Sequence, residues 1–373
     1  MRMRASSFAI ITCLLTGLIV ATSVHSVEEE EFPERLSQWD LFDLRDGQLI
    51  PRDATVYDLK TPLFSDYALK LRTIRVPKGM AIQAGNDELI FPLGTVISKT
   101  FYYPRAAPQA SESRSLVDKA EEAQQVESLN MSRVQLLETR LLIKTYLGWQ
   151  ALPYVWNADQ SDATLEVAGE SFPLTLVQGR ERIDFDYMVP DANQCSSCHG
   201  VNGTELKPIG LKVQHLNKDR AYGSRVRNQL AYWQEIGLLE GPIASAPVTA
   251  AWNDTRESLD ARARAYLDVN CSHCHSAAGS ANSSGLLLDQ GDHDPVHLGI
   301  CKPPVATGRA SGNDSYSIVP GSPRESIMVY RMQSTEPDIA MPELGRSIVH
   351  KEGVALISEW IRAMDGGCAE MSE

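Results

Sequence analysis

The segment from Val27 to Gln194 contains neither histidine nor cysteine. Imidazole and thiolate are the usual protein ligands of zinc, copper and non-haem iron, so this absence excludes a site for these metals from the segment. Its carboxylates would suit only a hard cation such as calcium. Apart from Cys13 and His25, every cysteine and histidine lies after Gln194. Residues that could carry metal or thiol chemistry are therefore confined to the C-terminal part.

Positive charge and long apolar runs are also scarce. The chain has 35 Lys and Arg against 48 Asp and Glu, a formal net charge of -13. An excess of this sign repels phosphate groups, which argues against nucleic acid or an anionic membrane surface as a partner.

Outside residues 9–21 no apolar run is long enough to cross a membrane, so we expect no transmembrane segment in the mature chain.

The one long apolar run belongs to the N-terminus. It spans 13 residues from Ala9 to Ala21, follows a basic start and precedes small residues and an acidic stretch. This order is typical of a secretory signal peptide, and we expect cleavage after Ser26 and a location in the periplasm. An uncleaved anchor is one alternative. The other, a lipoprotein attached through Cys13, is disfavoured because a further apolar run follows this cysteine.

Two copies of the pattern C-x-x-C-H carry most of the chemical information. In this pattern the two thiols add to the haem vinyl groups as thioethers, and the histidine ligates the iron. A structural zinc site usually has its C-x-x-C pairs about 15 to 20 residues apart, and a thioredoxin-like redox pair needs a βαβ context. Neither condition is met, so the sequence predicts two covalently bound haem c groups. The residues concerned are Cys195, Cys198 and His199 at the first motif and Cys271, Cys274 and His275 at the second.

Met341 is the best candidate for the distal ligand of the second haem. It lies downstream of His275, just ahead of a predicted helix. A thioether is a soft ligand that favours ferrous iron and raises the reduction potential, which suits an electron carrier. Met328 and Met332 are the competing methionines, and simple packing is the ordinary role of this residue type.

The distal ligand of the first haem stays open. No methionine occurs between His199 and Cys271, and His215 is the only histidine in that interval. Met188, just ahead of the motif, is the alternative to His215. A third arrangement is an open coordination position, which would admit a small substrate.

Two cysteines remain once Cys13 is removed with the signal peptide and four are assigned to haem. These are Cys301 and Cys368. An even pair in an oxidising compartment favours a disulfide, and two free thiols are the alternative.

The pattern of residues predicts several domains. Residues 27–189 are rich in β-branched and aromatic runs punctuated by Pro and Gly, which predicts an antiparallel all-β domain, a sandwich or a barrel. Within it, residues 111–131 are polar and weakly helical and are predicted to form a surface excursion. Residues 190–250 and 251–373 carry the two motifs and amphipathic patterns. We expect them to form two mainly α-helical cytochrome c modules, the second similar to class I cytochrome c.

Three helices are expected in these modules. The first begins at the cap Ser224 and stops at Gly237. The second is capped by Asn253 or Asp254 and leads into the second motif. The third carries an apolar stripe over residues 354–364.

Several runs of residues resemble those of a known group, the bacterial exported di-haem c-type cytochromes, which are often encoded beside a parallel β-helix repeat protein. The resemblance covers nearly the whole mature chain. The matching pieces are TPLFSDYA at Thr61, FPLGTVISKTF at Phe91, ETRLL at Glu138, YVWN at Tyr154, PIG at Pro208, NQLAYW at Asn228, YLDVNCSHCH at Tyr266, CKPP at Cys301, IVPG at Ile318 and MPELGR at Met341. The resemblance implies two covalent haems at the two motifs, Met341 as the ligand of the second haem, and a bond between Cys301 and Cys368.

From these residues we expect a periplasmic di-haem c-type cytochrome that carries single electrons between a donor and an acceptor protein. Two alternatives stay open. One is a di-haem peroxidase-like oxidoreductase with an open first haem site, and the other is a haem-bearing subunit of a larger complex. Whether the chain turns over a substrate is not decided by the sequence, although electron transfer is favoured.

Overall fold

The computed structural model of this chain describes residues 31–85, 88–106, 114–120, 125–203, 205–243, 246–305 and 308–368. The predicted signal peptide, Cys13 included, lies outside these ranges. Residues 33–373 form one compact unit. Among the helices of the described ranges, none is long and apolar enough to cross a membrane.

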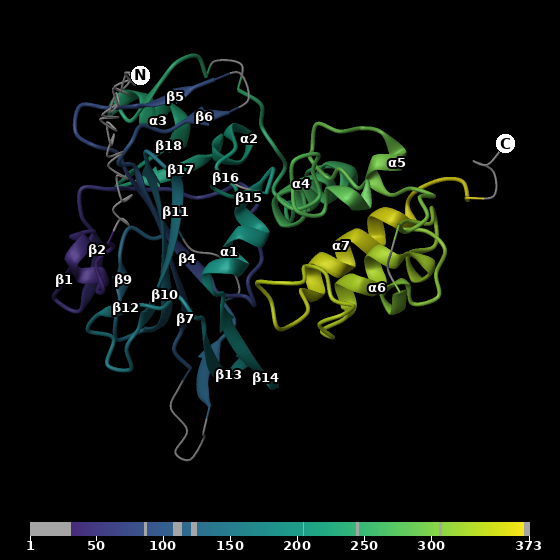
Figure 1. The fold of residues 1–373 in the computed structure, drawn as a ribbon, viewed down its shortest axis with the longest axis horizontal. Coiled ribbons are helices and arrows are strands. Elements are labelled where there is room, and N and C mark those ends of the chain that lie inside the picture. Colours follow the sequence, from purple (N-terminus) through teal and green to yellow (C-terminus); the bar gives the residue numbers. More distant parts are fainter. Residues whose placement is uncertain are drawn as a thin grey trace, which may run out of the picture. The chain divides into compact units, whose positions relative to one another are not determined.

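A six-stranded antiparallel sheet is the largest element of the described fold (Figure 1). Its strands, in spatial order, are β12 (Ala163–Leu165), β11 (Gly148–Trp156), β10 (Val134–Thr145), β7 (Val96–Pro104), β4 (Leu69–Arg75) and β3 (Thr55–Val56). Strand β10 has a bulge between Leu136 and Glu138 where it pairs with β7. Branched and aromatic side chains dominate these strands, which suits a pleated surface buried on both faces.

The described residues also form five smaller sheets. They are β1 (Phe42–Arg45), β2 (Gln48–Pro51) and β9 (Leu129–Asn130); β14 (Glu181–Val189), β13 (Glu170–Gln178) and β8 (Ser115–Asp118); β19 (Leu239–Glu240), β5 (Ile82–Ala84) and β6 (Leu89–Ile90); β15 (Gly200–Val201) and β16 (Glu205–Leu206); and β17 (Asp219–Tyr222) and β18 (Arg225–Asn228). The described part of residues 111–131, which is predicted to form a surface excursion, contains the short strands β8 and β9. Val117 of β8 is fully buried where β8 pairs with β13, and such packing overrides a weak helical propensity.

Seven α-helices occur in the described ranges. They are α1 (Ala192–His199), α2 (Val213–Leu216), α3 (Gln229–Glu235), α4 (Leu259–Asn270), α5 (Pro295–Leu298), α6 (Ile327–Gln333) and α7 (Lys351–Arg362). Short 3-10 helices cover Leu36–Trp39, Asn282–Ser284, Gly308–Ser311 and Pro323–Glu325.

Two of these helices begin later than predicted. Helix α3 is capped by Asn228 and not by Ser224, because strand β18 occupies the residues between them. Helix α4 is capped by Ser258, whose Oγ accepts a backbone N–H of the first turn, and not by Asn253 or Asp254. In both cases a good capping residue nearer the apolar stripe defines the start of the helix.

The predicted succession of an all-β domain and mainly α-helical cytochrome c modules is wrong. Strands make up 31% of the described residues and helices 21%, and no all-α cytochrome c module is evident among them. Residues 190–250 contain the short strands β15–β19 beside α1–α3, and β19 pairs in parallel with β5. The physical reason is that Leu230 and Trp233 enter the same apolar core as Ile97 of the large sheet. This segment completes the core of the β structure instead of folding as a helical unit.

Helices α4 and α7 approach each other closely at Gly353. A Cβ at this position would lie 2.2 Å from Oη of Tyr266 on α4, so only glycine fits here. Leu267, Ile357 and Ile361 are fully buried in the same apolar cluster. Full burial of such a side chain contributes about 1.5–3 kcal/mol, so this contact fixes the position of α4.

Hydrogen bonds join the β structure to the segment that contains α4 and α7. The N–H of Phe64 donates to Oδ1 of Asn270 at 2.8 Å. The carboxylate of Asp66 accepts from the N–H groups of Ser347 and Ile348 at 2.8 and 3.0 Å, while burial raises the pKa of Asp66 to about 6. Helix α4 is therefore anchored at the residue just before the second C-x-x-C-H motif.

Candidate functional site

The first motif lies on α1, which contacts β11 and β16. Asp191 and Gln194 form a capping box, in which each side chain accepts the backbone N–H of the other residue. The motif residues within the helix are Cys195, Cys198 and His199. Gly200 is the C-cap of α1, and only glycine fits there because a Cβ would lie 2.4 Å from the carbonyl oxygen of Ser196.

The second motif follows directly after α4. The helix ends at Asn270, and Cys271 is its C-cap. The N–H groups of Cys274 and His275 both donate to the carbonyl of Cys271, which curls the motif into a turn. Gly279 lets the chain pass close to this turn, since a Cβ there would lie 2.2 Å from the carbonyl oxygen of Cys274.

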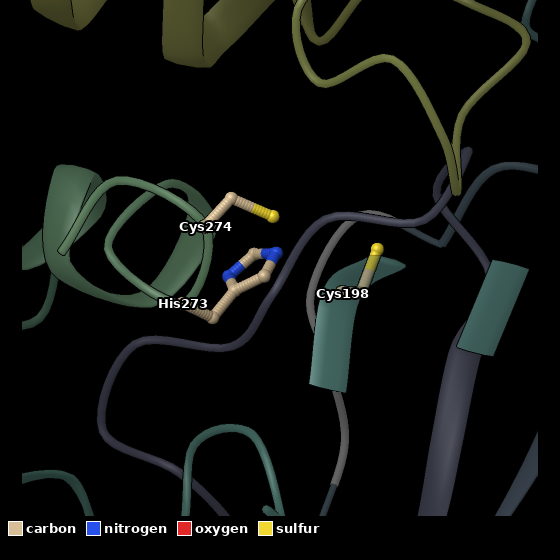
Figure 2. A group of neighbouring side chains, drawn as sticks. All are labelled: Cys198, His273 and Cys274. Atoms are coloured by element: carbon tan, nitrogen blue, oxygen red, sulfur yellow. The ribbon is translucent and has the colours of Figure 1, made fainter. Parts of the chain in front are cut away.

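The two motifs lie side by side although they are far apart in sequence. Sγ of Cys198, Sγ of Cys274 and a ring nitrogen of His273 are all within 4.8 Å of one another, and Figure 2 shows the three side chains gathered between two segments of the chain. The carbonyl of Ser197 accepts the Oγ–H of Ser280 at 2.8 Å and the Sγ–H of Cys274 at 3.6 Å. No local sequence pattern specifies which distant segments meet, so this contact was not predicted.

The cysteines divide into two kinds. Cys301 and Cys368 form a disulfide, and these are the two cysteines that the sequence leaves unassigned to haem. The four motif cysteines are free thiols. Thioether formation requires free thiols, so the four free motif cysteines fit a haem at each motif.

The pKa values of the motif thiols differ with their surroundings. Burial raises the pKa of Cys271 to about 12 and raises that of Cys195 above its usual value. For Cys274 a hydrogen bond from Cys198 holds the pKa well below the ordinary range of a thiol. The contact between the motifs therefore favours the thiolate form of one of the two sulfurs that meet there.

Each motif histidine leaves Nε2 free for a metal. Nδ1 of His199 lies 2.7 Å from the carbonyl oxygen of Lys207, and because a carbonyl only accepts, Nδ1 carries the proton. Nδ1 of His275 lies 3.1 Å from Oγ of Ser284, whose own hydroxyl donates to the carbonyl of Ala281 at 2.7 Å. This Nδ1 therefore donates as well. In both rings Nε2 keeps its lone pair, as in histidines that ligate metals.

Burial keeps the two motif histidines neutral, and a cavity lies beside the first motif. Burial lowers the pKa of His199 to about 3 and lowers that of His275, so both rings are neutral near pH 7. A cavity of about 680 Å³ is lined by Ser196 of the first motif and by Ser280, which follows the second. Apolar surface in the same cavity comes from Trp149. Free thiols and neutral imidazoles fit the donor set of a covalently attached haem, whereas the recorded lining of the cavity includes none of the motif cysteines or histidines.

Met341 lies in the loop between α6 and α7. Its N–H donates to the carbonyl of Arg331 at 3.0 Å, and its own carbonyl accepts from Nη2 of Arg346 at 2.9 Å. The charge of Arg331 acts together with burial to lower the pKa of His275. The pairing of Met341 with His275 at one iron stays a prediction.

The two candidates for the distal ligand of the first haem have different surroundings. Met188 lies on β14 with 53% of its surface exposed. His215 lies on α2 and is fully buried, with Nε2 2.6 Å from Oδ2 of Asp268 on α4. Nδ1 of His215 is buried and has no hydrogen-bond partner in the described part of the chain. The contacts of His215 are thus with the helix that leads into the second motif.

Asp268 is the centre of a buried network that was not predicted. Besides His215, its carboxylate accepts from Nζ of Lys212 at 2.5 Å and from Oγ of Ser272 at 3.2 Å, and Lys212 also reaches Asp289 at 2.6 Å. Burial alone would raise the pKa of Asp268, but the hydrogen bonds from His215 and Lys212 hold it well below its usual value. The network ties α2 to the helix of the second motif.

A row of three cations crosses the large sheet near the first motif. Arg72 on β4 is directly opposite Lys99 on β7, and Lys99 is directly opposite Arg140 on β10. Directly opposed residues project from the same face, so we call Arg72, Lys99 and Arg140 the cation row. Two unit charges about 6 Å apart repel by about 3 kcal/mol at an effective dielectric constant of about 20. Burial, with Arg72 and Arg140, lowers the pKa of Lys99 to about 7.

Comparisons with family models, with curated proteins and with solved structures find no match for this chain. The function has to be inferred from the site itself. That site combines two adjacent C-x-x-C-H motifs, four free thiols, two histidines with an available Nε2 and a row of cations.

Proposed function

We propose that this chain is an exported c-type cytochrome with two covalently bound haem c groups, which passes single electrons between donor and acceptor proteins of the periplasm. The observation that carries the proposal is the pairing of two C-x-x-C-H motifs, each with free thiols and a histidine whose Nε2 is available. The resemblance to exported di-haem cytochromes supports the same function.

Cysteine and histidine side chains would hold the two haem groups in different ways. Haem c supplies reversible one-electron chemistry at its iron. The thiols of Cys195 and Cys198, and those of Cys271 and Cys274, are the attachment points. Nε2 of the following histidine would ligate the iron at each motif, with its ring held by the carbonyl of Lys207 or the hydroxyl of Ser284.

Met341 is proposed as the distal ligand at the second motif. Its backbone is fixed on both sides, by Arg331 and by Arg346, so the thioether is presented from a constrained segment. No such residue is proposed for the first motif. A distal position without a protein ligand there would support the peroxidase-like alternative, and the experiment below separates the two.

A second candidate function follows from the contact between the motifs. Cys198, Cys274 and His273 offer three soft donor atoms within 4.8 Å of one another, which suits a zinc ion. A sulfur that has become a thioether no longer serves as a thiolate ligand. The haem and zinc functions therefore exclude each other at Cys198 and Cys274.

The first experiment measures what the exported chain carries. We expect the pyridine haemochrome spectrum and the intact mass of protein purified from the periplasm to show two haems per chain. Cys198→Ser should lose covalent attachment at one motif only. An unmodified mass together with one zinc ion per chain would instead establish the metal-thiolate function.

The second experiment identifies the axial ligands by low-temperature EPR of the ferric protein. We expect Met341→Leu to change one low-spin signal and the matched variant Met332→Leu to change none, because Met332 is a buried core residue. Two low-spin haems in the wild type favour electron transfer. One high-spin haem that binds cyanide would contradict simple electron transfer and favour the peroxidase-like enzyme.

A further inference from the structure

One sulfur of each C-x-x-C-H motif lies at the contact between the two motifs. Sγ of Cys198 on α1 and Sγ of Cys274 in the turn after α4 are within 4.8 Å of each other, and Figure 2 shows both side chains in the same gap. Sulfur atoms bond as a disulfide at about 2.05 Å, with their Cβ atoms about 3.5–4.5 Å apart. The approach that is still needed lies within the reach of side-chain rotation.

The other cysteine of each motif has different surroundings. Cys195 is 8% exposed, and Cys271 packs against the apolar cluster of α4 and α7. Cys195 and Cys198 are three residues apart within α1, where Cβ atoms lie about 5–6 Å apart, which is wider than a disulfide accepts. The cluster of donor atoms that the described residues form at the contact includes neither Cys195 nor Cys271. A bond between the motifs is thus favoured over a bond within the first motif.

Hydrogen bonds hold the two segments in this position. The carbonyl of Ser197 accepts from Oγ of Ser280 at 2.8 Å and from Sγ of Cys274 at 3.6 Å. The N–H of Asn202 donates to the carbonyl of Ala278 at 2.9 Å, so the residues that follow each motif are also joined. Holding two reacting groups in place makes their reaction effectively unimolecular.

Both sulfurs are also within reach of a reagent from solvent. Cys198 and Cys274 are partly exposed, whereas Cys195 is buried. The cavity of about 680 Å³ is lined by Ser196 and Ser280, which are neighbours of the pair. Access of this kind is one of the conditions for exchange between thiols and a disulfide.

We propose that Cys198 and Cys274 form a disulfide that joins the two motifs in the haem-free chain. The two thiols give up two protons and two electrons as their S–S bond forms, and a small disulfide such as oxidised glutathione takes these up and leaves as two thiols. The bond withdraws one attachment sulfur from each motif, so one oxidation closes both motifs to haem. This consequence rests on the proposed function, whereas the bond itself does not.

The first test maps disulfides in the purified haem-free chain after a chelator has removed bound metal. The protein is equilibrated with reduced and oxidised glutathione, quenched in acid, unfolded, alkylated and digested without reduction, and linked peptides are identified by mass spectrometry. Wild type and the matched control Cys195→Ala should contain the Cys198–Cys274 bond, and Cys198→Ser and Cys274→Ser should not.

The wild-type map decides the matter without relying on the folding of any variant. Bonds only within a motif, only glutathione adducts at Cys198 and Cys274, or free thiols at both positions while the Cys301–Cys368 bond is intact would overturn the proposal.

The second test separates this disulfide from the proposed function. Chains in the periplasm are trapped with an alkylating reagent and sorted by intact mass into haem-loaded and haem-free forms, and we expect the Cys198–Cys274 bond in the haem-free form alone. If the bond is mapped but no chain carries haem, the proposed function fails and the disulfide site stands. If haem-loaded chains occur and haem-free chains have only free thiols at Cys198 and Cys274, the disulfide proposal fails and the proposed function stands.

Discussion

The sharpest test of the folded structure is removal of the carboxylate of Asp268. The side chains of Asp268 and His215 are both fully buried, and Lys212 is the third member of the network. Asp268→Ala leaves His215 and Lys212 without their common acceptor. Removing one partner of a buried charged pair typically costs about 3–5 kcal/mol, and we expect a loss of this size in the free energy of unfolding. Asp268→Asn keeps the shape and should lose about 1–3 kcal/mol.

The assay is urea unfolding followed by tryptophan fluorescence, with a double-mutant cycle. His215→Gln and Asp268→Ala should be non-additive by at least about 1 kcal/mol, because the two side chains are 2.6 Å apart. Glu336→Ala is the control, since the ion pair of Glu336 with Arg309 is exposed and should contribute less than about 1 kcal/mol. A loss below about 1 kcal/mol for Asp268→Ala, or strict additivity with His215→Gln, would refute the network.

The stability that the Asp268 carboxylate contributes should also depend on pH. The pKa of Asp268 is lower in the folded protein than the value of about 3.9 expected in the unfolded chain. Its ionised form therefore stabilises the fold at pH values above about 4, and this contribution is lost as the pH falls toward the folded pKa. The stability difference between wild type and Asp268→Asn should shrink from pH 5 to pH 2. A difference that stays constant over this window would contradict the assigned hydrogen bonds.

Three further predictions concern other parts of the fold. Reduction of the Cys301–Cys368 disulfide, which closes a separation of 67 residues, should lower the free energy of unfolding by about 4 kcal/mol, and no effect of reductant on the urea midpoint would count against it. Gly353→Ala should cost about 1–3 kcal/mol by overpacking, because its Cβ would lie 2.2 Å from Oη and 2.5 Å from Cζ of Tyr266 and 2.6 Å from Nδ1 of His350, and an unchanged urea midpoint would contradict this packing. Asp66→Asn should gain stability relative to wild type as the pH rises from 4 to 6, by up to about 3 kcal/mol, since the raised pKa of about 6 means that ionising the buried carboxyl destabilises the fold. Equal urea midpoints at both pH values would argue against that raised pKa.

The sequence predicted the strands of the large sheet better than it predicted the organisation of the chain. Alternating and β-branched runs such as residues 96–103 form strands as expected. The division into a β domain and helical modules failed because Leu230 and Trp233 look like one face of an amphipathic helix and give no sign of which core they enter. Periodicity reports that a face is buried, but it does not report the partner surface.

The candidate site shows the same limit. The C-x-x-C-H motifs are local patterns, so their residues could be listed from the sequence, and the tautomers of His199 and His275 then followed from the structure. The contact between Cys198 and Cys274 depends on how α1 and the turn after α4 meet, which no local pattern encodes. The same holds for Asp268, whose neighbours come from a helix far away in sequence.

The cation row shows that the arrangement of three charged residues on one sheet face is visible only in the folded structure. In the strand around Lys99, alternation places a charged residue on the face of Ile97 and Phe101, where the pattern calls for an apolar one. One such residue in one strand has an ordinary explanation, because a lysine often extends its charge to the surface. Three in register on adjacent strands repel one another, and the charges of Glu138 and Asp58 act against this repulsion at Lys99 and Arg72. A fold keeps such a conflict where an anion offsets it, and conflicts between local pattern and burial are typical of functional sites. The register of the sheet, which the sequence does not reveal, is therefore what brings three separate charges into one row.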